Sequence, residues 1–210
     1  MWRIDPAGDQ ALLVRLGSSI NATLLSEVLA LEGSLQEMHL PGLRSTVSAY
    51  ASLLCQYDPE QISAAQLKDR IRSLEGTLTL VELAGDLVEI PTTYDGPDLA
   101  EVAEQTGLSR PEVIERHSEP SYLVYCVGFA PGFTYCGELD ERLAIPRRSS
   151  PRLNVPAGSV AIAAHQTGIY AVDSPGGWHL IGRTDTVLFN PNVNPPARFK
   201  PGDRLRFRPI

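Results

Sequence analysis

The stretch that decides the fold of the second half of this chain is SVAIAAHQTGIYAVDSPGGWHLIGRT, residues 159–184. Short apolar runs alternate there with a Pro-Gly-Gly turn, a pattern typical of short strands. Similar runs continue on both sides, from SYLVYCVGF at 121–129 to PGDRLRFRPI at 201–210. The strict alternation of the last run predicts a half-exposed strand. The sequence therefore predicts an all-β domain of barrel type over residues 119–210.

The first half of the chain alternates predicted strands and helices. Asn21 opens a helix, because apolar residues spaced three or four apart follow it. Asp58, Pro59 and Gln61 supply a cap, a first-turn proline and a capping-box partner for a second helix. The predicted order is a strand at 8–16, a helix from Asn21, two strands at 43–50 and 51–58 or one bent strand over both, a helix from Asp58 and a strand at 86–95. This order predicts a ferredoxin-like βαββαβ domain over residues 1–95, and the whole chain is predicted to be α+β.

Residues 96–118 are predicted to form a helical connector between the two domains. A helical pattern ends at Gly107, and glycine is the residue that most often follows the last turn of a helix. Ser109 and Glu112 then form the capping box of a second short helix.

The composition is that of a globular chain with many turns. Of its 210 residues, 43% are hydrophobic and 20% are charged, and there are 17 glycines and 17 prolines. The net charge of −7 argues against nucleic acid or an anionic membrane as a partner, because both require a dominant basic face. The N-terminal stretch does not read as a signal peptide and no run of about 18 apolar residues occurs, so we expect a cytoplasmic protein.

Neither a disulfide framework nor a metal site is indicated. Cys55, Cys126 and Cys136 form no C-x-x-C pair, and thiols used as small apolar side chains explain them. Cys136 stands out because it lies in a glycine-rich loop. His165 and His179 lack a third ligand nearby in the sequence, a pattern that does not favour zinc.

The glycine-rich loop GFAPGFTYCG, residues 128–137, is the first candidate site. Its glycines allow the backbone to approach a ligand, and Phe129, Phe133 and Tyr135 offer apolar or stacking walls. The loop matches neither a dinucleotide-binding motif nor a Walker motif. The alternative is an aromatic loop that closes one end of the barrel without binding anything.

An arginine-rich segment, residues 142–159, is the second candidate. Its guanidinium groups suit bidentate contacts with carboxylate or phosphate, and three prolines stiffen the backbone that presents them. The arginines are Arg142, Arg147, Arg148 and Arg152. A solvated loop without a ligand is the alternative.

The opening stretch is itself the third candidate. Three of the four residues at 161–164 are alanines, so a ligand or a neighbouring backbone can come close to that strand. His165, Gln166 and Thr167 are predicted to emerge where the strand ends. Histidine can carry protons near neutral pH, and glutamine can orient a carbonyl or an amide. The alternative is a hydrogen-bonded surface histidine with no catalytic role.

Four linked motifs resemble the allophanate hydrolase subunit 1 family, also called KipI-like, which includes the B subunit of bacterial 5-oxoprolinase. In chain order they are GFAPGFTYCG, IPRRSSPRLNVPAGSVAI, QTGIY and SPGGWHLIGRT. Their order and spacing match over residues 119–210, and the N-terminal pattern fits the rest. The resemblance implies an N-terminal α/β domain followed by a cyclophilin-like β-barrel domain.

The resemblance also implies an activity and partners. Such a protein pairs with an allophanate hydrolase subunit 2, or KipA-like, protein, and with a LamB/YcsF-type subunit the pair hydrolyses 5-oxoproline to glutamate with ATP. Because this chain has no Walker motif, ATP is expected in the partner or shared with it. Two other functions stay open: a carboxyltransferase or allophanate-hydrolase type of subunit acting on a urea derivative, and a KipI-like inhibitor of a histidine kinase.

Roles for individual residues follow from the same resemblance. Arg148 and Arg152 would hold phosphate or carboxylate, and Gln166 and Thr167 would contact the lactam amide. His165 is a candidate proton carrier, although the family motif does not carry a histidine there. The remaining predicted contacts are Phe129, Phe133, Tyr135, Gly176, Gly177, Trp178 and Arg183.

Overall fold

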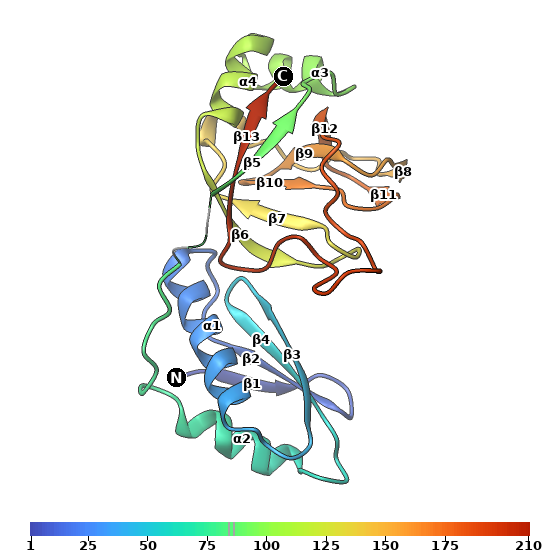
Figure 1. Cartoon of the computed structure of the whole chain (residues 1–210). Coiled ribbons are helices and arrows are strands. Elements are labelled where there is room, and N and C mark those ends of the chain that lie inside the picture. Colours follow the sequence, from blue (N-terminus) through green and yellow to red (C-terminus); the bar gives the residue numbers. More distant parts are fainter. Residues whose placement is uncertain (84, 86) are drawn as a thin grey trace. The chain divides into compact units, whose positions relative to one another are not determined.

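The computed structural model of the chain describes residues 1–83, 85 and 87–210 (Figure 1). Its contacts divide the chain into two compact units, Met1–Leu83 and Ala84–Ile210. Each unit contains a hydrophobic core of its own. Within the described residues, no helix combines the length and the apolarity that crossing a membrane requires.

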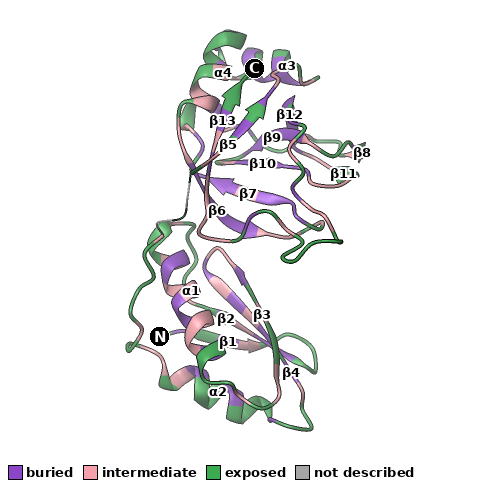
Figure 2. Cartoon of the chain, viewed as in Figure 1, coloured by how far each residue is buried: buried purple, intermediate pink, exposed green. Residues whose placement is uncertain are grey.

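The first unit is a four-stranded antiparallel sheet with two helices packed on it. The strands lie in the order β1-β2-β4-β3. The elements are β1 (Arg3–Pro6), β2 (Ala11–Arg15), α1 (Ala22–Glu37), β3 (Leu43–Ala49), β4 (Ser52–Tyr57) and α2 (Ala64–Ser73). Leu31 of α1 and Ile71 of α2 are fully buried in one core with Val14 and Leu53 of the sheet. Figure 2 shows buried and partly buried residues alternating along the middle of α1, as expected for a helix with one packed face.

The two helix starts of this unit use different sequence signals. Asn21 caps α1 as predicted, and its side chain accepts a 2.9 Å hydrogen bond from the N–H three residues further on. The predicted helix start at Asp58 is wrong. Gln61 does donate a 3.0 Å hydrogen bond to Asp58, but within a turn, and α2 begins only after Ser63, which forms a capping box with Gln66. Two capping patterns follow each other here, and the local sequence alone does not decide between them.

The predicted last strand of the βαββαβ domain belongs to the second unit, so that prediction is wrong. β5 (Leu87–Thr92) pairs in parallel with β13 (Arg204–Pro209), and the predicted first residue of the strand, 86, lies outside the described residues. The first unit instead has the order ββαββα. The alternation around buried Ile90 specifies a strand but not its partner, and Ile90 lies opposite Phe207 in the core of the second unit.

The second unit is a nearly closed, barrel-like sheet, in agreement with the predicted β-rich second half. Seven strands lie in the order β12-β9-β10-β7-β6-β13-β5, and a separate two-stranded ribbon pairs β11 with β8 (Figure 1). The other strands are β6 (Tyr122–Val127), β7 (Thr134–Gly137), β8 (Arg152–Val155), β9 (Ser159–Ala163), β10 (Gln166–Ile169), β11 (Ser174–Gly176) and β12 (His179–Arg183). The two outer strands are joined where Thr93 and Arg183 exchange two backbone hydrogen bonds of 2.9 Å.

Two helices follow β5 and pack against this sheet. α3 (Leu99–Thr106) and α4 (Arg110–Ser118) each bury a valine, Val102 and Val113, in the core of the barrel. In Figure 1 both helices lie at one end of the sheet. The residues predicted to connect two domains are therefore part of the second unit.

The chain ahead of α3 runs unusually close to β12. A Cβ atom at Gly96 would lie 2.3 Å from the carbonyl oxygen of Leu180, so a side chain there would collide with the backbone of β12. The N–H of Gly96 donates to the carbonyl of Ile181 at 3.2 Å, and the N–H of Asp98 donates to the carbonyl of Leu180 at 3.0 Å. The backbone contacts that close the barrel between β5 and β12 therefore extend along the chain to the start of α3.

The helix boundaries predicted within this segment are confirmed. Gly107 ends α3 in the left-handed conformation, with φ of 67°. Ser109 and Glu112 form the predicted capping box at the start of α4. A single-turn 3-10 helix, η1 (Glu141–Leu143), lies between β7 and β8.

The two faces of β9 pack against different groups of side chains. Val160 and Ile162 belong to the large core of the barrel, whereas Ala161 and Ala163 belong to a second apolar cluster. The other members of that cluster are Phe133, Val155, Tyr170, Trp178 and Leu180. Because side chains alternate along a strand, the small residues of β9 all face these rings. The run of small residues thus lets an aromatic cluster pack directly on the sheet.

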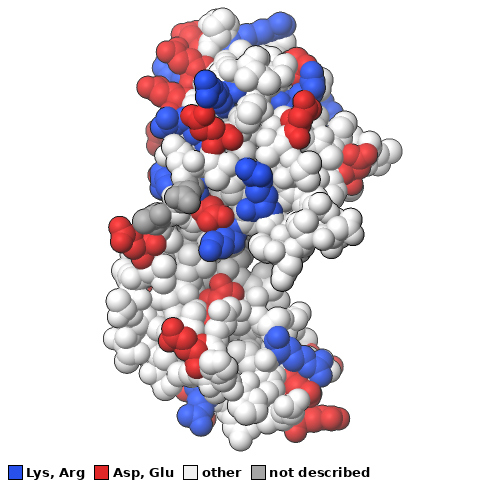
Figure 3. Space-filling model, in the orientation of Figure 1, with Lys and Arg blue, Asp and Glu red and all other residues white. Residues whose placement is uncertain are grey.

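Charged side chains of both signs are interspersed on the face drawn in Figure 3. This mixture accompanies the formal net charge of −7. On this face, a charged ligand would therefore be selected by a few local groups rather than by a broad field of one sign.

Candidate ligand-binding pocket

A pocket of about 260 Å³ opens over the aromatic cluster of the second unit. Four segments supply its walls: β7 with the loop before it, the chain ahead of β8, the residue after β10, and β11 with the turn after it. The lining residues are Phe129, Phe133, Tyr135, Arg147, Pro151, Tyr170, Pro175, Gly176, Gly177 and Trp178. Its volume is near the lower end for small-molecule sites, and mostly aromatic walls with one cation are typical of such a site.

Phe133 is the centre of the ring cluster. It is 2% exposed, and its ring makes edge-to-face contacts with four other rings at centroid distances between 4.6 and 5.9 Å. Tyr135 and Trp178 also contact each other at 5.7 Å. Edge-to-face pairs add packing energy beyond simple burial and hold each ring in one orientation. The floor of the pocket is therefore rigid.

Gly176 is required for the position of Tyr170. A Cβ atom at Gly176 would lie 2.2 Å from the hydroxyl oxygen of Tyr170. The same hydroxyl is hydrogen-bonded to the backbone of Trp178. The absence of a side chain at position 176 thus allows a tyrosine to pack against the turn that ends in the tryptophan.

Phe129 forms an exposed part of the pocket wall. It is 67% exposed and has φ of 71°, a conformation that side chains other than glycine, asparagine and aspartate rarely adopt. Its ring contacts Phe133 edge to face at 5.9 Å. Exposure of a large ring in a strained backbone is typical of a residue retained for binding.

Arg147 is the cation of the pocket. It is exposed, and within the described parts of the chain it forms no ion pair with a carboxylate. Burial raises the pKa of Tyr135 and Tyr170, and the positive charge of Arg147 opposes that rise at both tyrosines. Its field therefore reaches both phenol groups of the pocket.

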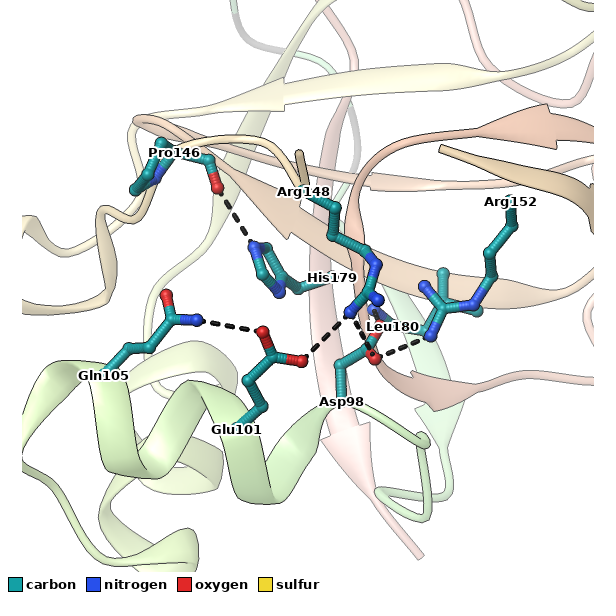
Figure 4. A network of polar contacts seen from close by, with 8 residues as sticks. All are labelled: Asp98, Glu101, Gln105, Pro146, Arg148, Arg152, His179 and Leu180. Carbon is teal, nitrogen blue, oxygen red and sulfur yellow. Dashed lines mark hydrogen bonds and ion pairs between the residues drawn. The ribbon is translucent and has the colours of Figure 1, made fainter. Parts of the chain in front are cut away.

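Directly behind the pocket lies a buried ion network centred on Asp98, which is 3% exposed (Figure 4). One oxygen, Oδ1, accepts from Arg148 at 3.0 Å and from Arg152 at 2.6 Å. The other, Oδ2, accepts from the backbone N–H of Leu180 at 2.7 Å. Arg148 also donates to Glu101 at 3.0 Å. Two guanidinium groups and two carboxylates thus neutralise each other beneath the pocket wall.

Six of the predicted contact residues lie together in the pocket. They are Phe129, Phe133, Tyr135, Gly176, Gly177 and Trp178. Arg148 and Arg152 lie behind it in the Asp98 network, and Arg183 is paired with Asp95 at 3.0 Å on the barrel surface. These three arginines are not among the pocket residues.

The residues of the QTG motif also lie outside the pocket lining. His165 is exposed in the turn between β9 and β10, and Gln166 is the partly buried first residue of β10. Thr167 is buried inside the barrel, where its hydroxyl lies 2.7 Å from Nε2 of His117. Cys136 is likewise buried in the barrel core, and burial raises the pKa of its thiol. None of these residues is among the described residues that line the pocket.

Three lining residues were not among the predicted contacts. They are Arg147, Pro151 and Tyr170. Arg147 belongs to the arginine-rich segment, but nothing in that segment distinguishes it from Arg148. Tyr170 directly follows β10, and the alternation of that strand would have placed it on the same face as Gly168. This period-two argument is the one signal that could have found it.

The chain belongs to the family described as carboxyltransferase domain, subdomain C and D, whose sequence model matches residues 2–199. Among its relatives, the B subunit of 5-oxoprolinase from Bacillus subtilis (strain 168) is 41% identical over 223 residues, which cover 98% of this chain and 92% of the relative. The B subunit of 5-oxoprolinase from Escherichia coli O157:H7 is 52% identical over 125 residues, covering 58% of this chain and 57% of the relative. The family resemblance predicted from the motifs is confirmed.

A solved structure shares the fold over almost the whole chain. The crystal structure of TTHA0988 superposes with a TM-score of 0.86 and 39% identity, covering 96% of this chain. The matched part is 40% of the TTHA0988 chain. The two-unit α/β architecture is therefore shared with a protein whose chain is more than twice as long as the matched part.

Proposed function

We propose that this chain is the B subunit of a 5-oxoprolinase complex, which hydrolyses 5-oxoproline to glutamate. The observation that carries the proposal is the 41% identity, over 98% of the chain, with the corresponding 5-oxoprolinase subunit of Bacillus subtilis. The pocket supports it, because a cavity of about 260 Å³ with aromatic walls suits a small ring.

The lining of the pocket suggests that it binds the substrate without catalysing the reaction alone. Opening a lactam breaks the amide C–N bond and adds water, which requires groups that accept and donate protons. Within the described chain, the pocket is lined by no carboxylate, histidine, cysteine or serine. Its two tyrosines, Tyr135 and Tyr170, have a pKa raised by burial, so they keep their protons at neutral pH. We therefore propose that another subunit supplies the acid and base groups.

ATP does not fit the residues of this pocket. A triphosphate is bound by several backbone N–H or cationic groups, and the pocket offers one guanidinium, that of Arg147. Arg148 and Arg152, which were candidates for holding phosphate, face Asp98 instead. We therefore propose that ATP binds to the partner subunit.

The partner proposed for this chain is a subunit 2, or KipA-like, protein, together with a LamB/YcsF-type subunit. The relatives are named as one lettered subunit of 5-oxoprolinase, which implies further subunits. The matched part of TTHA0988 is 40% of that chain, so a unit like this one occurs there next to additional polypeptide. Both observations support a protein that works as part of a larger assembly.

The proposal is tested by reconstitution. The chain is co-purified with its subunit 2 and LamB/YcsF-type partners, and glutamate release from 5-oxoproline is measured with and without ATP. We expect ATP-dependent turnover by the full set of subunits and none by this chain alone. A complete, assembled complex that releases no glutamate would disprove the proposal.

A second candidate is favoured by the description of the family as a carboxyltransferase domain. In that case the chain would be part of an enzyme that transfers a carboxyl group to or from a urea derivative. The distinguishing result is dependence on a biotinylated carrier protein. Activity on a urea derivative that disappears when the carrier is omitted would support this function over lactam hydrolysis.

A further inference from the structure

Two arginines of the arginine-rich segment, Arg142 and Arg147, form no ion pair within the described residues, and of these two Arg147 lines the pocket. Arg148 and Arg152 lie in the network behind the pocket, where Asp98 and Glu101 balance their charges (Figure 4). Arg147 stands between Pro146 and Arg148 but lines the pocket. Consecutive residues of one extended segment thus face in different directions, one toward buried carboxylates and one toward the ligand space.

The backbone on both sides of Arg147 is anchored by hydrogen bonds. On one side, the carbonyl of Pro146 accepts from Nε2 of His179 at 3.0 Å, and His179 is 2% exposed (Figure 4). On the other side, the N–H of Arg148 donates to the carbonyl of Gly177 at 2.9 Å. Because both neighbours are held, the long side chain of Arg147 starts from a fixed position at the edge of the pocket.

Both anchors are connected to the same buried carboxylate. Asp98 holds the guanidinium of Arg148 through Oδ1 and the N–H of Leu180 through Oδ2. Leu180 follows His179 directly on β12, so Asp98 holds the strand that carries His179. Asp98 also holds the side chain of Arg148, whose N–H makes the second backbone hydrogen bond. Removing its charge would leave Arg148 and Arg152 without their shared buried partner.

The remaining features define the chemistry of the ligand. Aromatic walls suit a flat ring, and a guanidinium without a partner suits a carboxylate through two parallel hydrogen bonds. We propose that Arg147 binds the carboxylate of a small cyclic acid in this pocket, and that Asp98 is the positioning residue that holds Arg147 ready for it. The choice of 5-oxoproline as the acid rests on the proposed function.

The test compares two ligands that differ only in the carboxylate. Binding of 5-oxoproline and of 2-pyrrolidinone, the same lactam without the acid group, is measured by calorimetry on the full-length chain. The measured quantity is the dissociation constant of 2-pyrrolidinone divided by that of 5-oxoproline. This ratio is used because partial unfolding of a variant lowers the binding of both ligands alike. For Arg147→Ala we expect a loss of roughly tenfold or more in affinity for 5-oxoproline and no change for 2-pyrrolidinone.

Asp98→Asn is expected to reduce the same ratio by acting through Arg147. In the double variant Asp98→Asn with Arg147→Ala, the ratio should equal that of Arg147→Ala alone. Asp98→Glu, which keeps the charge, should restore part of the discrimination. Should Asp98→Asn fail to fold, Glu101→Gln removes only one contact of Arg148 and is expected to lower the ratio less.

Matched controls are available in the same unit. Asp140, like Asp98, pairs with an arginine and accepts a backbone N–H, but it does not line the pocket or contact Arg148. Asp140→Asn and Arg142→Ala should therefore leave the ratio unchanged.

Three results would overturn the inference. An unchanged ratio in Arg147→Ala would show that Arg147 does not contact the carboxylate. A further decrease of the ratio when Asp98→Asn is added to Arg147→Ala would show that Asp98 does not act through Arg147. Binding of neither ligand by the wild-type chain would exclude the ligand class. Glutamate release by the reconstituted complex is a separate measurement, so the proposed function can survive this failure.

Discussion

At the scale of single residues, His117 is the buried titratable group with the clearest consequence. Its Nδ1 lies 2.7 Å from the hydroxyl of Tyr94 and its Nε2 lies 2.7 Å from that of Thr167. Thr167 donates onward to the carbonyl of Ala161 at 3.2 Å, so it accepts the Nε2 proton. Nδ1 is then the acceptor for Tyr94. The imidazole is therefore bound as its neutral Nε2–H form.

This environment predicts a loss of stability on mild acidification. Complete burial lowers the pKa of His117 from its ordinary value of 6.5 to about 3. Between these values the unfolded chain binds one proton more, so the contribution of His117 is fully present above pH 6.5 and is lost as pH falls toward 3. We expect the free energy of unfolding to drop by up to about 1.4 kcal/mol per pH unit within this window. Urea unfolding at pH 7, 6 and 5 measures the slope.

The variant His117→Gln provides the control for this prediction. It removes the titration, so the slope between pH 7 and 5 should flatten even though the protein is less stable overall. Carboxyl groups whose pKa is lowered by hydrogen bonds, such as Asp58 bound to Gln61 and Glu112 bound to Ser109, lose their contribution only at lower pH. An equally steep slope in the variant would show that another group is responsible.

At the scale of secondary-structure elements, the period-two alternation of β9 and β10 separates the core from the pocket. Val160, Ile162 and Thr167 contribute to the barrel interior, while Ala161 and Ala163 lie under the aromatic rings. A residue on the interior face cannot also line a pocket on the other face. Thr167, although part of the family motif, therefore lies in the barrel interior and not in the lining of this pocket.

This arrangement predicts the effect of enlarging a small residue of β9. Ala161→Leu inserts three carbon atoms beneath the rings of Phe133 and Trp178, so we expect a loss of roughly 1–3 kcal/mol in stability and strongly weakened binding of 5-oxoproline. Ser109→Ala removes a helix cap in the same unit at a cost of about 1 kcal/mol but should bind like the wild type. Thermal unfolding and calorimetry measure the two quantities. Equal affinities in both variants would contradict the role assigned to β9.

At the scale of the whole molecule, each of the two units has a hydrophobic core of its own, and the described residues that line the pocket all belong to the second unit. Arg147 and the charged network around Asp98 also lie within the second unit. Because a core is stabilised by its own buried contacts, damage to one unit need not change the geometry of a site in the other.

Leu31→Ala tests this separation. Leu31 is fully buried in the first unit, and its truncation should cost about 2–5 kcal/mol in the stability of that unit. Hydrogen exchange should show faster opening of amides in the first unit and unchanged protection of β9, β10 and β12. The dissociation constant for 5-oxoproline should equal that of the wild type. Lost binding with full protection of the barrel strands would show that the first unit contributes to the pocket.

The sequence by itself determined most of the elements of this protein and the family to which it belongs. Caps at Asn21, Gly107 and Ser109 and the alternation of the last strand are local signals, because a backbone group and its partner lie within a few residues. The aromatic residues of the loop at 128–137 and the family resemblance of the Pro-Gly-Gly turn identified six of the pocket residues.

Only the tertiary structure decided which elements and charges meet. β5 pairs with β13, which lies at the far end of the chain, and Asp98, unremarkable in the sequence, became the partner of two arginines that follow it by 50 and 54 positions. Arg147 and Arg148 are chemically identical neighbours, and one faces the pocket while the other faces Asp98. The physical reason is that hydrogen bonds and ion pairs between distant segments depend on the closure of the barrel, which no local pattern encodes.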